Sequence, residues 1–104
     1  MLTKYIPCDG FVAVLTPHFL AQYAQRADLL DKSSFYKEYF ERIFAKALPN
    51  EVVGWLCSRA FIYARKKYNE RRARWELEFI SCTPNRHFHT TNNATAKMIV
   101  VEER

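Results

Sequence analysis

Residues 74–82, RWELEFISC, carry the clearest secondary-structure signal in the chain. Three apolar residues alternate there with three charged ones, and this period of two predicts a strand with one buried face. The stretch 60–68 (AFIYARKKY) alternates in the same way before its charged residues begin. Residues 69–72 (NERR) lie between the two stretches and predict a hairpin tip, so we expect an antiparallel pair.

The chain upstream of this hairpin predicts one strand and two helices. Residues 11–15 (FVAVL) form a short apolar run that is typical of a buried strand. Thr16 then fits a helix N-cap with proline at the first helical position, and the apolar spacing extends this helix over 17–30. A second helix, capped by Ser33 or Ser34, is expected to run to about Leu48.

The remaining segments complete the expected fold. Residues 52–57 (VVGWLC) fit a short helix or a strand, and we favour the helix; residues 97–101 (KMIVV) predict a last strand. A polar loop, with part of a strand around Arg86–Thr90, is expected between 83 and 96. The 104 residues therefore predict a single α+β domain: an N-terminal strand, two or three helices, then a mainly antiparallel sheet of about three or four strands with the helices on one face.

Positive charge is concentrated in one part of the chain. Residues 1–58 hold six basic and six acidic side chains, whereas residues 59–97 hold nine basic and three acidic ones. A clustered positive field is typical of proteins that bind polyanions such as nucleic acids. An acidic protein partner, or a charged face that only maintains solubility, would fit the same composition.

Cysteine content and hydropathy indicate a reducing, cytoplasmic environment. The three cysteines are an odd number and widely spaced, which does not fit a disulfide framework. The first residues lack the apolar core of a signal peptide, and no apolar run approaches the ~20 residues of a membrane span. We therefore expect a cytoplasmic protein without a membrane anchor, and no motif indicates a cofactor.

The basic hairpin is the best-supported candidate for binding RNA. The basic residues on its two strands are expected to face each other, so that like charges crowd together unless a phosphate backbone neutralises them. Tyr68, next to the tip, is the preferred residue for stacking on a base, whereas Trp75 and Tyr63 fit the core as well as a stacking role. The predicted RNA-binding residues are Arg65, Lys66, Lys67, Tyr68, Arg71, Arg72, Arg74 and Arg86.

His18, at the start of the first helix, is a candidate general base. It shares a helical face with Gln22 and Arg26, and an arginine there could hold a phosphate. A helix N-terminus disfavours a cation, so a neutral imidazole that accepts a proton is expected. The alternative is an exposed histidine without a chemical task.

His87 and His89 are the other candidates for acid–base chemistry. On an extended segment these two side chains point to the same face and could act on a ribose 2′-hydroxyl and a leaving oxygen. Cys82 with the same two histidines could instead hold zinc, although this spacing lacks a clear fourth ligand. Two polar loop histidines without such a role are the third interpretation.

The string 14–26 (VLTPHFLAQYAQR), followed by a second helix and basic antiparallel strands, resembles the RelE-type endoribonuclease superfamily, nearest its phage early-message endoribonuclease branch. The resemblance covers residues 10–101 in element order. It implies cleavage of RNA without metal, with His18 at the position of the branch's first-helix histidine. The branch's histidine on the second helix has no counterpart in 33–48, and a C-terminal tyrosine of the RelE kind is also missing.

Together these features predict a basic domain that binds single-stranded RNA. Cleavage by His18 and one of His87 or His89, and binding without cleavage, are both compatible with the sequence. A non-catalytic, phage-like regulator that binds an acidic protein is the alternative. Phe35, Phe40 and Phe44 on the second helix exceed what one apolar stripe needs, so both a monomer and a homodimer fit the sequence.

Overall fold

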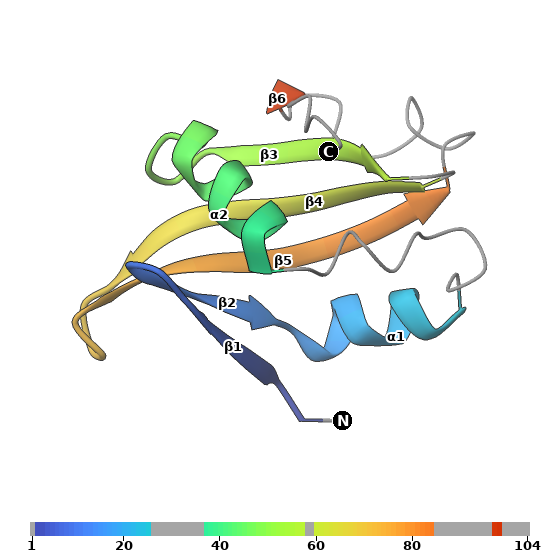
Figure 1. Cartoon of the computed structure of the whole chain (residues 1–104). Coiled ribbons are helices and arrows are strands. Elements are labelled where there is room, and N and C mark those ends of the chain that lie inside the picture. Colours follow the sequence, from blue (N-terminus) through green and yellow to red (C-terminus); the bar gives the residue numbers. More distant parts are fainter. Residues whose placement is uncertain (1, 26–36, 58–59, 85–96, 99–104) are drawn as a thin grey trace.

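The computed structural model describes residues 2–25, 37–57, 60–84 and 97–98. These residues form one sheet with two helices packed against it (Figure 1). The strands lie in the order β1-β2-β5-β4-β3-β6, and β6 is only two residues long. The elements are β1 (Lys4–Cys8), β2 (Phe11–Leu15), α1 (Pro17–Gln25), α2 (Lys37–Lys46), β3 (Val52–Cys57), β4 (Ala60–Asn69), β5 (Arg74–Pro84) and β6 (Lys97–Met98).

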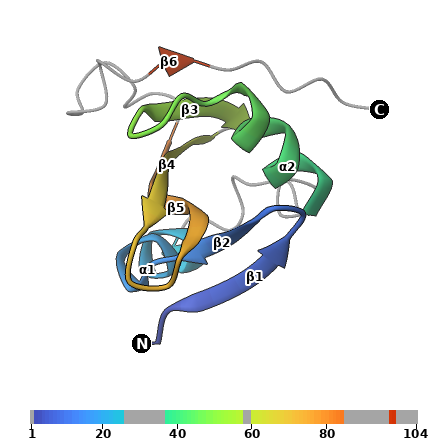
Figure 2. The same ribbon diagram turned by 90° about the vertical axis from the view of Figure 1, so that its left-hand side faces the viewer.

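The predicted α+β class is confirmed, but the sheet is larger than expected and mixed. Strand β2 pairs with β5 in parallel, and β3 pairs with β6 in parallel, while the other three pairs are antiparallel. The sheet curves strongly, and α2 lies across its open side (Figure 2). The additional strand β1 pairs with β2 in antiparallel orientation. A tight turn connects the two strands at Gly10, whose φ of 82° is readily adopted by glycine.

The predicted hairpin of β4 and β5 is confirmed. The ladder runs from Ala60 opposite Pro84 to Asn69 opposite Arg74, with one irregularity between Tyr63 and Ala64. At the tip, the backbone N–H of Arg72 donates to the side-chain oxygen of Asn69 at 3.1 Å. An asparagine that accepts from its own turn in this way is a usual device for closing a hairpin.

The predicted N-cap at Thr16 is also confirmed. The N–H of Phe19 donates to Thr16 Oγ1 at 3.2 Å, and the hydroxyl itself donates to the carbonyl of Phe79 on β5 at 3.0 Å. Strand β2 stops opposite Phe79, and beyond it the N–H of Cys82 donates to Gln22 Oε1 of α1 at 2.9 Å. Beyond the end of β2, helix α1 therefore lies along the edge of β5 and accepts a hydrogen bond from it.

Both helices pack on the same face of the sheet, as predicted. Phe79 is fully buried there, with ring centroids of Phe19, Phe40 and Trp55 at 5.2, 5.0 and 5.8 Å. Phe44 stacks on Phe11 at 4.1 Å. Phe40 and Phe44 thus belong to the core of the chain itself, which removes them as an argument for a partner; Phe35 lies outside the described residues.

The helix expected at Val52–Cys57 is wrong, because this segment is strand β3. A glycine and two β-branched residues in six disfavour a helix, and pairing along the whole segment with β4 decides for a strand. Helix α2 ends at Lys46, two residues before the predicted end, and β5 continues to Pro84, two residues beyond the predicted strand. The predicted end of the first helix, the predicted start of the second helix and most of the predicted last strand lie outside the described residues.

Candidate nucleic-acid interface

The β4–β5 hairpin separates its charged residues between two faces. In the ladder Arg65 lies opposite Glu78 and Lys67 opposite Glu76. The expectation that like charges crowd together across the two strands is therefore wrong, because Arg65, Lys67 and Arg74 on this face each meet a carboxylate. This face of the sheet lies on the side away from the helices and is called the outer face below.

Glu78 is held by two cations on the outer face. Its carboxylate oxygens lie 3.1 Å from Arg65 Nη2 and 2.9 Å from Lys67 Nζ. Partial burial raises the pKa of this carboxyl, but the hydrogen bonds and charges of Lys67 and Arg65 outweigh that effect, so the pKa lies below its usual value of 4.5. Glu78 is consequently ionised and paired at neutral pH.

The Glu78 pairing predicts a defined dependence of stability on pH. Because the folded pKa lies below 4.5, the ionised form adds stability that is complete above pH 4.5 and is lost as pH falls through the folded pKa. Glu78→Gln removes this titration. The difference in unfolding free energy between the two proteins, measured by urea denaturation from pH 7 downwards, should therefore shrink below pH 4.5. A difference that stays constant to pH 3 would contradict the ionised pairing.

Glu76 is a nearly buried carboxylate with its own partners. It is 3% exposed and accepts from Arg74 Nε at 2.9 Å and from Asn69 Nδ2 at 3.3 Å. A buried charge is tolerated when it is paired and hydrogen-bonded in this way. Arg74 Nη2 has no hydrogen-bond partner among the described residues, so its guanidinium is only partly satisfied by Glu76.

Lys66 and Tyr68, two of the predicted RNA-binding residues, lie on the helix-facing side of the hairpin instead. Lys66 Nζ donates to the carbonyls of Phe44 and Ala47 at 3.3 and 3.2 Å, so it closes the C-terminal end of α2. The Tyr68 ring packs edge-on against Trp75 with centroids 5.3 Å apart. Trp75 is itself packed against the core, as one of its two interpretations predicted.

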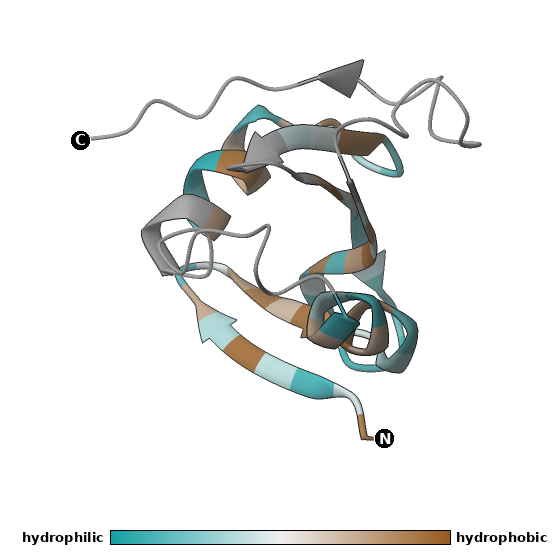
Figure 3. Cartoon of the chain, turned by 90° about the vertical axis from the view of Figure 1, so that its right-hand side faces the viewer, coloured by the Kyte–Doolittle hydropathy of each residue, from teal (hydrophilic) through white to brown (hydrophobic). Residues whose placement is uncertain are grey.

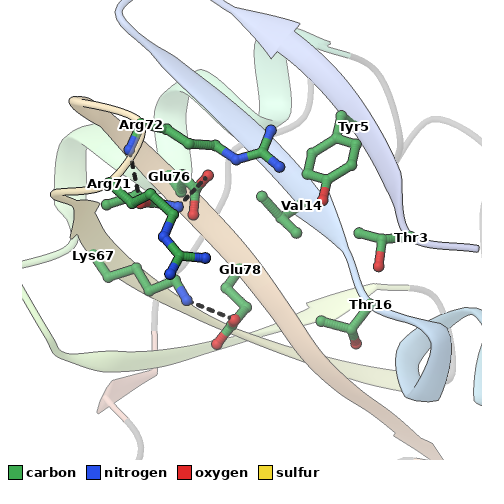
Figure 4. Close-up of a pocket in the computed structure, with 10 residues that line it drawn as sticks. Thr3, Tyr5, Val14, Thr16, Lys67, Arg71, Arg72, Glu76 and Glu78 are labelled. Carbon is green, nitrogen blue, oxygen red and sulfur yellow. Dashed lines mark hydrogen bonds and ion pairs between the residues drawn. The ribbon is translucent and has the colours of Figure 1, made fainter.

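The tip of the hairpin supplies the remaining cations. Within the part of the chain that the structure describes, the side chains of Arg71 and Arg72 form no ion pair. Both lie beside a hollow of about 310 Å³ on the outer face (Figure 4). The hollow is lined by Thr3, Tyr5, Val14, Thr16, Lys67, Asn69, Arg71, Arg72, Glu76 and Glu78.

Electrostatically, cations exceed carboxylates around this hollow. The residues that line it include three basic side chains, Lys67, Arg71 and Arg72, and two acidic ones, Glu76 and Glu78. Glu78 already pairs with Lys67 and Arg65, and Glu76 pairs with Arg74. The two tip arginines, next to each other in sequence, carry the surplus. An arrangement of this kind can hold the oxygens of a phosphate group, which guanidinium recognises through paired hydrogen bonds.

Tyr5 is the residue of this site that the sequence reasoning missed. It lies on β1 opposite Val14, and its side chain lines the hollow with 47% exposure. The guanidinium carbons of Arg72 and Arg74 each lie 5.5 Å from the ring centroid. The only usable signal was the alternation of Lys4–Cys8, which the hydropathy colouring shows along β1 (Figure 3).

The predicted acid–base residues are only partly described. His18 is exposed at the start of α1, two residues after Thr16, which lines the hollow. Gln22, expected to share its face, accepts a hydrogen bond from the backbone of β5. The other predicted residues, Arg26, Arg86, His87 and His89, lie outside the described residues, and so does the zinc alternative that needs the last two.

Comparisons with known proteins assign no family to this chain. The chain matches no protein-family model, no curated protein and no solved structure. Over the described ranges, no group of three or more His, Cys, Asp or Glu side chains is placed to hold a metal ion. Neither described helix has the length and apolar character needed to span a membrane. The resemblance to RelE-type endoribonucleases therefore stays a prediction.

Proposed function

We propose that this protein binds single-stranded RNA on the outer face of its sheet, with phosphates held at the hollow by Lys67, Arg71 and Arg72. The observation that carries this proposal is the pair of adjacent tip arginines without ion-pair partners among the described residues. They stand beside Arg65 and Lys67, which share the single carboxylate of Glu78, and beside Arg74, which pairs with Glu76. A polyanion would supply the missing negative charge.

The ion pairs beneath the hollow support this function by ordering the surface. Glu78 fixes Arg65 and Lys67, and Glu76 fixes Arg74. Exposed ion pairs contribute little to stability, usually below about 1 kcal/mol. Their effect here is to hold the cations in place, so that less side-chain freedom is lost when a phosphate binds.

Cleavage of the bound strand is the second part of the proposal, and it rests on His18 and on the resemblance to RelE-type endoribonucleases. In support, the second helix α2 and the antiparallel pair of β4 and β5 follow the string 14–26 along the chain, as the resemblance requires, although β1 and the strand at Val52–Cys57 are not part of it. An exposed imidazole close in sequence to the hollow could take the proton of a ribose 2′-hydroxyl.

The test combines purified protein, mixed single-stranded RNA and a chelator at about 50 mM salt, where phosphate contacts are strong. We expect the protein to bind the RNA and to cleave it at defined sites. His18→Ala should abolish cleavage, while its RNA affinity stays nearly unchanged. Undiminished cleavage by His18→Ala would remove this histidine from the mechanism. Intact RNA whose electrophoretic mobility is shifted by the protein would support RNA binding and contradict cleavage. Intact RNA without a shift, with a stoichiometric partner recovered from nuclease-treated lysate, would favour the protein-binding regulator.

A further inference from the structure

Tyr5 lies on the outer face of the sheet, away from the apolar core. The apolar core lies on the other face of the sheet, against the helices, whereas Tyr5 projects to the outer face beside Val14. The residue is 47% exposed and lines a hollow whose other lining residues are mostly charged or hydroxylated. Among the described residues that line the hollow, Tyr5 is the only aromatic one.

Two cations lie close to this ring. The guanidinium carbons of Arg72 and Arg74 are each 5.5 Å from its centroid, within the range of cation–π attraction. This attraction holds the two arginines near Tyr5, and the residue stays 47% exposed beside them. Figure 4 shows the Arg72 side chain extending from the hairpin tip toward Tyr5 across the hollow, with Arg71 above Lys67.

An aromatic face next to phosphate-binding cations is the combination that recognises a nucleotide without reading its sequence. Every base has a π-face that can stack on tyrosine, and the neighbouring guanidinium groups neutralise its phosphate. A volume of about 310 Å³ lies at the lower end of the range for small-molecule sites. A phosphate alone would need only the cations, so the ring indicates that a base enters as well.

We propose that the hollow takes one unpaired nucleotide, with its base stacked on Tyr5 and its phosphate at Arg71 and Lys67. This inference rests on the proposed RNA binding and names the part of the RNA that is recognised. Bases in a duplex are stacked on each other and cannot reach a ring inside a hollow, so the site selects single strands over duplexes. It also assigns stacking to Tyr5, whereas the sequence pointed to Tyr68.

The test compares Tyr5→Ala and Tyr5→Phe in binding to a single-stranded RNA and to a duplex of the same length. Tyr5→Ala should weaken single-strand binding roughly 5- to 150-fold, the effect of losing one stacked base. Its duplex affinity should not change, and Tyr5→Phe should retain the single-strand affinity. Tyr68→Ala is the matched control, because Tyr68 is also 47% exposed but lies on the opposite face of the hairpin; it should bind single strands as the wild type does.

Three outcomes would overturn the inference while leaving RNA binding itself intact. Tyr5→Ala could bind single strands as tightly as the wild type. It could lose single-strand and duplex affinity equally, which would mean that Tyr5 only positions Arg72. Tyr68→Ala could instead show the selective loss. Circular dichroism of each variant checks that it is folded. If the wild-type protein itself binds no RNA, the proposed function fails and not this assignment alone.

Discussion

Exchanging Arg71 and Arg72 together for glutamate is expected to weaken the binding of single-stranded RNA about 100-fold or more at low salt. A hydrogen bond to a charged group contributes about 1.5–3 kcal/mol, so two lost contacts cost at least about 3 kcal/mol. Each 1.4 kcal/mol is about tenfold in Kd. Because phosphates are the same at every position, the loss should be similar for RNAs of different sequence. Fluorescence anisotropy with labelled RNA measures it.

A matched control separates the site from the overall charge of the protein. Arg42→Glu with Lys46→Glu changes the net charge by the same amount, but both residues lie on α2, on the helix-covered face of the sheet. This control should retain most of the RNA affinity. If the two double variants lose affinity equally, the binding follows net charge alone, and the assignment to the hairpin tip is wrong.

Phe79→Ala is expected to have the largest effect on stability, lowering the free energy of unfolding by about 3–5 kcal/mol. Phe79 is fully buried, and rings from α1, α2 and β3 meet on it. Removing it leaves a cavity at the point where both helices contact the sheet, and aromatic contacts are lost in addition. Urea denaturation followed by circular dichroism measures the change.

Leu48→Ala provides the comparison for this variant. Leu48 is 60% exposed, so truncating it should change the unfolding free energy by no more than about 0.5 kcal/mol. A Phe79→Ala protein that loses less than about 1 kcal/mol would show that Phe79 does not join the helices to the sheet.

Elements with a strong local signal could be predicted from the sequence. The N-cap at Thr16, the strand that follows the hairpin tip and the aromatic face of α2 each depend on residues close together in the chain. Strand β1 could not be found in this way, because Pro7 and a charged residue weaken its pattern and its existence depends on pairing with β2. The strand conformation of Val52–Cys57 likewise depends on its pairing with the longer strand β4.

The charge pattern of the site depends on register, which local patterns do not fix. The hairpin closes with Asn69 opposite Arg74, and this pairing sets Lys67 against Glu76 and Arg65 against Glu78. The alternation of glutamates in β5 is visible in the sequence. Which basic residues of β4 lie opposite these glutamates follows only once the closing pair, Asn69 and Arg74, is known. A shift of one residue would have sent these side chains to the other face. Tyr5 was missed together with β1.

The salt dependence of RNA affinity tests the central claim most directly. Each phosphate of a single strand that a protein cation neutralises releases a counterion and adds about 0.7 to the slope of log Kd against log salt concentration. Contacts from Lys67, Arg71 and Arg72 therefore predict a loss of about 20-fold between about 50 and 200 mM salt, with a shallower slope for the Arg71→Glu/Arg72→Glu protein. RNA binding that does not respond to salt, or no measurable affinity at about 50 mM, would contradict the account.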